Sequence, residues 1–301
     1  MKPIVALNSA TQSTAFCQEA RQMLIDAGFE LRCNPGIRPT PDQLKEMVSG
    51  AWAIVAGTEK YTADVLEGAD QLKAIIRFGV GTDNFDLTAL REKKVAVGVI
   101  TNYNSVAEYT LTLMLNVLKN LPRLDRVVRE GQWARLPMRE LKGKTVGLVG
   151  FGRIGRRLAE LLRPFEVELL VYDPFVSADQ IEVCGAAAVS MDSLLARSDV
   201  VSLHLPYTPE THHLINTARG ALVDEKALCA ALTEGKLSGA ALDVFEKEPV
   251  TKENPLFALD NTVLSPHAAA LSYETNYNGS LICAESIIRV FRGEEPLYPV
   301  K

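Results

Sequence analysis

Histidine, cysteine and tryptophan are scarce in this 301-residue chain, which has four His, five Cys and two Trp. The cysteines are odd in number and form no C-x-x-C pair, so neither a disulfide framework nor a cysteine metal site is expected. A catalytic cysteine is a further alternative, but no histidine lies near one in the sequence, and buried thiols are usually inert. These features favour reduced thiols, the cytoplasm and no bound metal.

Long hydrophobic runs and basic clusters are absent as well. The N-terminal segment MKPIVALNSA holds an apolar run of about five residues, which is too short for a signal sequence or a membrane span. The formal net charge is -5, and no basic cluster exceeds a few residues, so the positive footprint of a nucleic-acid-binding protein is lacking. Neither nucleic acid nor a membrane is an expected partner.

What the chain does have is a repeated β-α pattern. Strands are expected in the first part at PIVALN, FELRC, AWAIVAG, LKAIIRFG and VAVGVI, and from residue 145 at TVGLVG, VELLVYD, DVVSLHL, LINTA, GAALDVF and NTVLSPH. An apolar helix over 106–121 separates the two series, and a last helix over Tyr273–Phe291 should stop at Arg292-Gly293. The length suits two cores. We therefore predict two Rossmann- or flavodoxin-like α/β domains with parallel sheets and an active site in the cleft between them.

Three glycines, Gly150, Gly152 and Gly155, form a G-x-G-x-x-G motif directly after the strand TVGLV and before a helical segment. In that context they permit a tight turn, close approach to a pyrophosphate and close helix–strand packing. Asp173 ends the next strand, 18 residues beyond Gly155, where a carboxylate suits the adenosine ribose and repels a 2'-phosphate. An ordinary strand–helix turn, and a turn-forming Asp before Pro174, are the alternatives for each feature alone. The combination predicts NAD.

Three further polar residues are expected at one edge of the second sheet. His267 follows a strand in LSPHAAA, Arg219 follows LINTA, and Glu248 lies just past GAALDVF. Ligands of open α/β sheets bind at the carboxyl ends of the strands. An arginine suits a carboxylate, a histidine exchanges a proton with an alcohol, and a nearby carboxylate orients its ring, as reduction of a 2-keto acid requires. For His267 alone, a structural histidine bonded to backbone is the alternative.

The segments GFGRIG, VYDP, HLPYTPET, NTARGALVDEKAL, ALDVFEKEP and SPHAA occur in this order, and together they resemble the D-isomer-specific 2-hydroxyacid dehydrogenases, above all the phosphoglycerate dehydrogenase branch. The likeness extends to RFGVGTDNFDL (77–87) and NSVAEYTL (104–111). It implies a substrate-binding domain made of residues 1–103 and 273–301, with an NAD-binding Rossmann domain, residues 104–272, inserted into it.

The resemblance also implies roles for individual residues. Arg219 would bind and polarise the substrate, His267 would be the acid/base, and Glu248 would pair with His267. Substrate contacts are implied for Arg77, Asn104 and the backbone amides of Val80 and Gly81. The implied NAD site consists of Val106, Gly150, Gly152, Arg153, Ile154, Gly155, Asp173, Leu205, Pro206, Thr217, Ala218, Arg219, Asp243, His267 and Ala269, with Asp243 beside the nicotinamide.

A homodimer is implied as well, formed through the helix and polar arm of residues 106–140. Trp133, in REGQWAR, would be an apolar anchor on the partner. The alternative is that Trp133 covers the core of its own domain. A long polar arm with one isolated tryptophan favours the homodimer.

The chain departs from the family pattern where HLPYTPETHH runs straight into LINTARG, without the helix that family members carry there. The eight residues PYTPETHH, fully extended, span about 26 Å, which is enough to return along a strand but not with a packed helix. A genuine deletion, a segment missing from the sequence, and a strand that no longer pairs normally are three open explanations. A real deletion would displace Arg219.

Two classes of function are consistent with these observations. The first is an NAD-dependent oxidoreductase that interconverts a small D-2-hydroxy acid and its 2-keto acid. It could be a 3-phosphoglycerate dehydrogenase, a hydroxypyruvate or glyoxylate reductase, or an enzyme that acts on another small acid of this kind. The second is a regulatory protein that senses NAD(H) with the same fold. The presence of Arg219, Glu248 and His267 together favours the enzyme.

Overall fold

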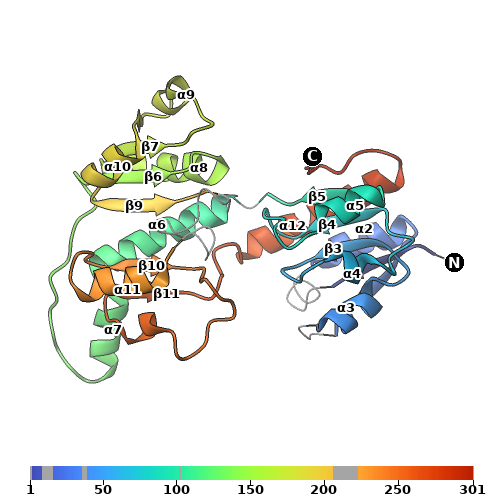
Figure 1. Cartoon of the computed structure of the whole chain (residues 1–301), viewed down its shortest axis with the longest axis horizontal. Helices are drawn as coiled ribbons and strands as arrows, with labels where there is room; N and C mark the ends of the chain where they lie inside the picture. Colours follow the sequence, from blue (N-terminus) through green and yellow to red (C-terminus); the bar gives the residue numbers. More distant parts are fainter. Residues whose placement is uncertain (1, 9–15, 36–38, 102, 206–222, 301) are drawn as a thin grey trace. The chain divides into compact units, whose positions relative to one another are not determined.

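A computed structural model of the chain describes residues 2–8, 16–35, 39–101, 103–205 and 223–300. The chain divides into two compact units, which Figure 1 shows with their helices and strands labelled. Unit 1 comprises Met1–Asn102 and Ala270–Lys301, and unit 2 comprises Tyr103–Ala269. Each unit is built on a parallel sheet with helices on its faces, so the predicted α/β class is confirmed.

Unit 1 contains a five-stranded parallel sheet in the order β2-β1-β3-β4-β5. Its strands coincide with the predicted apolar runs and are β1 (Ile4–Leu7), β2 (Glu30–Cys33), β3 (Ala51–Ala56), β4 (Ala74–Arg77) and β5 (Ala96–Val99). The chain moves outward in opposite directions from β1 and β3. The carboxyl ends of these two strands therefore form the topological switch point, which is where open α/β sheets bind their ligands.

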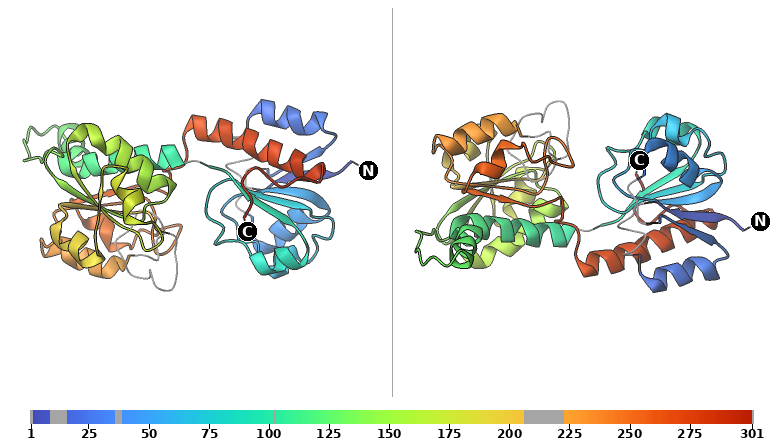
Figure 2. Two further views of the ribbon diagram at one scale, coloured as in Figure 1. Left: turned by 90° about the horizontal axis from the view of Figure 1, so that it is seen from above. Right: turned by 90° about the horizontal axis from the view of Figure 1, so that it is seen from below.

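Helices cover both faces of this sheet: α2 (Gln18–Asp26), α3 (Pro41–Val48), α4 (Ala63–Leu66), α5 (Leu87–Glu92) and α12 (Tyr273–Phe291). One apolar core joins α3, α4 and α5 to strand residues such as Ile54, and the other joins α2 and α12 to strand residues such as Val55. Successive strand residues point to opposite faces, so a strand buried on both sides is apolar throughout. Figure 2 shows α12 running beside α2, although the two are far apart in the sequence.

The last helix has the bounds that the sequence predicts. Ser272 caps its start by accepting a hydrogen bond from the backbone N–H of Thr275, and Gly293 follows its end with a φ of 83°. A glycine readily adopts this left-handed conformation after a helix.

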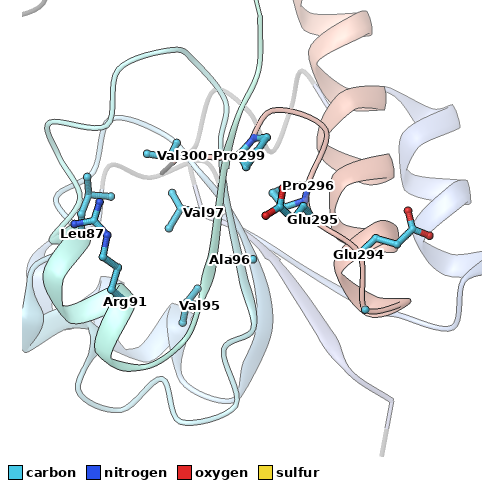
Figure 3. A pocket seen from close by; sticks show the side chains of 11 residues that line it. Leu87, Arg91, Val95, Ala96, Val97, Glu294, Glu295, Pro296, Pro299 and Val300 are labelled. Carbon is cyan, nitrogen blue, oxygen red and sulfur yellow. The ribbon is translucent and has the colours of Figure 1, made fainter.

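The segment after α12 packs along the outer edge of β5. Val99 N–H donates to Tyr298 O at 3.1 Å, and Val300 N–H donates to Val97 O at 2.9 Å. Beside these bonds lies a pocket of about 280 Å³, shown in Figure 3, lined by Arg91, by residues from the first half of β5 and by the terminal segment. It lies toward the amino end of β5, whereas α/β sheets bind ligands at the carboxyl ends.

Unit 2 contains a parallel sheet in the order β8-β7-β6-β9, built from β6 (Thr145–Val149), β7 (Glu168–Tyr172), β8 (Ala187–Ala188) and β9 (Val200–Leu203). A separate parallel pair is formed by β10 (Ala240–Leu242) and β11 (Thr262–Leu264). The strand expected at LINTA and the shortened connection before it lie outside the described residues. Strand β8 was not predicted, because two residues give no detectable pattern.

The helices of unit 2 are α6 (Tyr103–Lys119), α7 (Leu121–Arg129), α8 (Arg153–Leu162), α9 (Ala178–Glu182), α10 (Met191–Arg197) and α11 (Glu225–Thr233), with short 3-10 turns at Arg163–Phe165 and Pro255–Ala258. The prediction of one helix over 106–121 followed by a polar arm is wrong in one respect, because the arm begins with α7. Asn120 takes a left-handed conformation with a φ of 50° and ends α6, and Pro122 suits the first turn of the next helix. No helix in the described parts of the chain has the length and apolar character to cross a membrane.

Candidate active site

His267 and Glu248 meet beyond the carboxyl ends of β10 and β11. The Nδ1 atom of His267 lies 2.8 Å from Glu248 Oε2, and the two side chains are 45% and 34% exposed. The other carboxylate oxygen of Glu248 accepts a hydrogen bond from the backbone N–H of Phe245 at 3.1 Å. Because a carboxylate only accepts, Nδ1 carries a proton in this pair, which leaves Nε2 as the atom that can exchange a proton with a ligand.

Asp243 fixes the loop that carries His267. Its carboxylate is 2% exposed, and it accepts hydrogen bonds from Ser265 Oγ (2.6 Å) and from the backbone N–H groups of Ala268 (2.8 Å) and Ala269 (2.9 Å). The backbone N–H of His267 donates to Asp243 O at 2.7 Å. His267 itself has a φ of 53°, which is uncommon for a residue other than glycine and is typical of functional sites.

A second set of hydrogen bonds holds the loop that carries Glu248. Glu225 and Glu246 each accept a bond from the other's backbone N–H, at 2.7 and 2.8 Å, and Asn254 Nδ2 donates to Glu225 at 2.7 Å. Glu225 begins α11 and is 8% exposed. The sequence analysis assigned no role to Glu225, Glu246 or Asn254. The signal that the sequence offers for them is a carboxylate at the start of a helix, Glu225, and another just after a strand, Glu246.

The glycine-rich loop connects β6 to α8. Gly150 has a φ of 97°, and a Cβ atom there would lie 2.7 Å from His204 O; at Gly155 it would lie 2.4 Å from Gly150 O. A Cβ on Gly152, by contrast, would meet no atom within 4 Å. The fold thus requires Gly150 and Gly155, whereas Gly152 leaves open space at the start of α8, where backbone N–H groups attract an anion.

Asp173 follows β7, the neighbour of β6. Its carboxylate accepts hydrogen bonds from the backbone N–H of Phe151 at 2.7 Å, within the glycine-rich loop, and of Phe175 at 2.9 Å. Each oxygen can accept a second bond, so ribose hydroxyls can be bound as well. An open anion site at a helix start with a carboxylate beside it fits a dinucleotide without a 2'-phosphate. Arg153 and Ile154 form the first turn of α8, and Leu205 follows β9.

Replacing Asp173 with asparagine removes the negative charge and keeps one acceptor oxygen. We expect this variant to bind NADPH at least about 10-fold more tightly relative to NADH than the unmodified protein, because the repulsion of the 2'-phosphate is gone. Fluorescence titration with each nucleotide measures the ratio. An unchanged ratio would mean that another residue sets the preference.

His204 follows β9 and contacts Ser202, with Nε2 lying 3.0 Å from Ser202 Oγ. Burial lowers the pKa of His204 to about 4, so the imidazole is neutral at pH 7. In the unfolded chain a histidine has a pKa near 6.5. Below pH 6.5 the unfolded state therefore takes up a proton that the folded state accepts only near pH 4.

Stability should consequently fall between pH 6.5 and pH 4. We expect the free energy of unfolding of His204→Gln to fall by about 1 to 3 kcal/mol less over this pH range than that of the unmodified protein, because glutamine does not titrate. Urea unfolding at several pH values measures it in both proteins. Parallel pH curves for the two would show that His204 titrates alike in the folded and unfolded chains.

In unit 1, Arg77 at the end of β4 organises the loop that follows it. Its guanidinium donates to Gly81 O at 3.1 Å and to Phe78 O at 2.8 Å, while Gly79 O accepts from the backbone N–H of Ile100. The backbone N–H groups of Val80 and Gly81 have no partner among the described residues. A loop whose carbonyls are bonded and whose N–H groups are available suits an anion such as a carboxylate.

Asn104, expected to contact substrate, is engaged within unit 2. Arg157 Nε donates to its Oδ1 at 2.7 Å, and its Nδ2 donates to Glu108 at 2.8 Å, so Asn104 ties α6 to α8. Its neighbour Ser105, next to Val106, donates to Ala269 O at 2.8 Å. The remaining expected residues lie outside the described residues: Pro206, Thr217, Ala218 and Arg219.

Comparison with known proteins identifies the family. Residues 111–269 match the family model described as the D-isomer specific 2-hydroxyacid dehydrogenase, NAD binding domain. A D-3-phosphoglycerate dehydrogenase of Archaeoglobus fulgidus is 38% identical over 295 residues, covering 92% of this chain but only 56% of that protein. A glyoxylate reductase of Thermofilum pendens is 40% identical over 265 residues, covering 79% of this chain and 78% of that protein.

A solved structure shares the fold of the whole chain. The TT0316 protein of Thermus thermophilus superposes with a TM-score of 0.88 and 31% sequence identity, and the superposition covers the whole of both chains. The predicted resemblance is thus confirmed, including its phosphoglycerate dehydrogenase relatives. The chain belongs to the D-isomer specific 2-hydroxyacid dehydrogenase family, and most of its unit 2 is the NAD-binding domain of that family.

Proposed function

We propose that this protein is an NAD-dependent oxidoreductase that interconverts a small D-2-hydroxy acid and its 2-keto acid. The observation that carries the proposal is the pair of His267 and Glu248, 2.8 Å apart on a loop fixed by buried Asp243, in a unit whose family binds NAD. A histidine oriented by a carboxylate is a suitable proton donor and acceptor for an alcohol.

In the proposed reduction, each residue has one task. NADH, when bound, supplies the hydride. His267 delivers a proton from Nε2 to the keto oxygen, and Glu248 holds the ring in the required tautomer. The N–H groups of Val80 and Gly81 bind the substrate carboxylate in the loop that Arg77 organises, and unit 1 is the substrate-binding domain. Arg219 polarises the keto oxygen, a role that rests on the family resemblance.

The NAD site is proposed to include Gly150, Gly152, Gly155 and Asp173, whose geometry suits a pyrophosphate and a ribose. Asp243 joins it through the loop of residues 265–269. Both a phosphoglycerate dehydrogenase and a glyoxylate reductase are among the relatives, so the substrate is a small 2-keto acid, with or without a phosphate.

The test is to follow NADH absorbance while adding hydroxypyruvate, 3-phosphohydroxypyruvate, glyoxylate, pyruvate and oxaloacetate separately to the purified chain. We expect oxidation with at least one of them. If none is reduced although NADH binding is demonstrable by fluorescence, the oxidoreductase proposal fails and an NADH-sensing role takes its place.

We further propose a cytoplasmic homodimer. All five cysteines are free, which suits a reducing compartment. Helix α7 has no buried residue, and the arm after it leaves Trp133 84% exposed, so Trp133 does not cover the core of its own unit. The arm is nevertheless anchored, since Asn120 Nδ2 donates to Pro137 O and Arg126 pairs with Asp260. A structured arm that presents an exposed tryptophan favours contact with a partner subunit.

Replacing Trp133 with arginine should convert the dimer to a monomer at micromolar concentrations, because a charge would enter an apolar contact. Sedimentation velocity measures the change. Phe175→Arg is the matched control, since Phe175 is 93% exposed and lies outside the arm. A monomeric unmodified protein, or a dimer that both variants retain, would refute this interface.

A further inference from the structure

Helix α12 has a single glycine in its interior, Gly279. Glycine is less favourable than alanine inside a helix, because its backbone loses more freedom on folding. Gly279 is buried, and a Cβ atom there would lie 2.7 Å from Ile100 Cδ1 and 3.1 Å from Phe78 Cζ. The glycine therefore serves close packing, since it lets two side chains lie directly against the backbone of the helix.

These two side chains belong to the loop proposed to bind the substrate carboxylate and to its support. The loop consists of residues 78–81 and is here called the carboxylate loop. Phe78 is its first residue, and Phe78 packs on the same apolar core as α12. Ile100 is 1% exposed, and its backbone N–H donates to Gly79 O at 3.2 Å. The loop thus contacts α12 at Gly279 through its own side chain and through a residue that is hydrogen-bonded to it.

Helix α12 is fixed to α2 on both sides of Gly279. The backbone N–H of Cys17 donates to Ser280 Oγ at 3.1 Å, and Tyr277 OH donates to the carboxylate of Glu19. Cys17 and Glu19 lie at the start of α2, and Figure 2 shows the two helices side by side. A methyl group on Gly279 would therefore displace the two contacting side chains more easily than the helix.

The carboxylate loop would pass such a displacement along its backbone. The Arg77 guanidinium donates to Phe78 O at 2.8 Å and to Gly81 O at 3.1 Å, so one side chain joins the two ends of the loop. It also lies so close to Gly79 that a Cβ atom there would be 2.9 Å from Arg77 Nη1. Closely packed groups transmit strain, so a shift of Phe78 reaches the N–H groups that follow it.

We propose that Gly279 is a positioning residue for the substrate carboxylate. By admitting Phe78 and Ile100 against the backbone of α12, it fixes the position of the carboxylate loop and of its N–H groups. This inference rests on the proposed function and specifies how its substrate site is held. The carboxylate is bound alike in the ground state and in the transition state, so a displaced loop affects KM and leaves kcat nearly unchanged.

The experiment measures KM, kcat and NADH affinity for Gly279→Ala, with whichever of the five keto acids is reduced fastest. We expect KM to rise by about 10-fold, because small misplacements of the groups that hold a substrate are costly. The kcat should stay within about 3-fold of the unmodified value. NADH affinity should not change, because the NAD-binding domain lies in unit 2. An unchanged KM in the folded variant overturns the proposal.

Ile100→Val provides a rescue, because it removes Cδ1, the atom nearest to the added methyl group. It keeps the backbone N–H that binds Gly79 O. We expect the double variant of Gly279→Ala and Ile100→Val to return KM to within about 3-fold of the unmodified value, since the two residues are in contact and their effects are coupled. Ile100→Val alone should leave KM unchanged. A double variant with the KM of Gly279→Ala would contradict the proposal.

Gly293→Ala is the matched control for stability. It makes the same exchange just after α12, where no atom lies within 4 Å of the Cβ position but a φ of 83° strains an alanine. We expect a lower thermal midpoint and an unchanged KM. Gly279→Ala should keep its midpoint, because the better helix propensity of alanine offsets the tighter packing. An equal rise of KM in both variants would trace the effect to lost stability and overturn the proposal.

Phe78→Leu provides the test if Gly279→Ala does not fold. It removes the ring that contacts Gly279, so the loop loses the same support and KM should rise without a change in kcat. An unchanged KM in folded Phe78→Leu would refute the positioning role.

Failure of the proposed function is recognised separately. If none of the five acids is reduced, thermal protection by D-lactate in the presence of NAD⁺ is compared between the unmodified protein and Gly279→Ala. Protection that needs about 10-fold more D-lactate in the variant supports the positioning role without the catalysis. Equal protection of both proteins, or none, overturns it.

Discussion

Replacing His267 with alanine is expected to reduce kcat by about 10² to 10⁴-fold, the usual contribution of a positioned general acid. The imidazole is the group of the His267–Glu248 pair that can give up a proton from Nε2. NADH affinity should change little, because the glycine-rich loop and Asp173 lie beyond other strands of unit 2. Steady-state kinetics and fluorescence titration of NADH measure the two quantities.

Glu248→Gln is the control for this variant. It keeps a side chain of the same size beside the ring and removes only the charge that orients it, so we expect a smaller loss of about 10 to 100-fold in kcat. Turnover that is unaffected by His267→Ala would remove histidine from the mechanism. Equal losses in both variants would indicate that the ring acts only when it is oriented.

The sequence predicts the strands of both units well, for a physical reason. Parallel strands covered on both faces are apolar along their whole length, so AWAIVAG and TVGLVG stand out from the helices between them. The predicted bounds of the last helix agree with the structure, and Gly293 is the residue that marks its end in the sequence. The glycine motif can also be recognised in the sequence, because the turn between β6 and α8 requires glycines at this spacing.

Other features depend on contacts between distant segments and leave no local pattern. Asp243 was expected beside the nicotinamide, and its carboxylate holds the loop of His267 through bonds that span 22 to 26 positions. The reciprocal hydrogen bonds between Glu225 and Glu246 likewise join segments 21 positions apart. Such groups become visible once the register of the sheet is known.

Substitution of Gly155 by alanine is expected to destabilise unit 2 by about 3 kcal/mol or more and to abolish NADH binding. The added methyl group would lie 2.4 Å from the backbone oxygen of Gly150, and neither backbone segment can move without separating α8 from β6. Overpacking of a closely packed position usually costs 1 to 3 kcal/mol, and contact with backbone is less easily relieved than contact with a side chain. Urea unfolding measures the loss.

Gly152→Ala separates the structural requirement from the binding requirement in the same motif. A Cβ on Gly152 meets no atom within 4 Å, and its φ of -73° suits alanine, so stability should change by less than about 1 kcal/mol. NADH affinity should nevertheless fall by about 10 to 100-fold, because the methyl group would occupy the space through which a pyrophosphate approaches the first turn of α8. Normal NADH binding by this variant would place the pyrophosphate elsewhere. A folded Gly152→Ala protein that has lost NADH would instead show that the open space at the start of α8 serves the cofactor and not the fold.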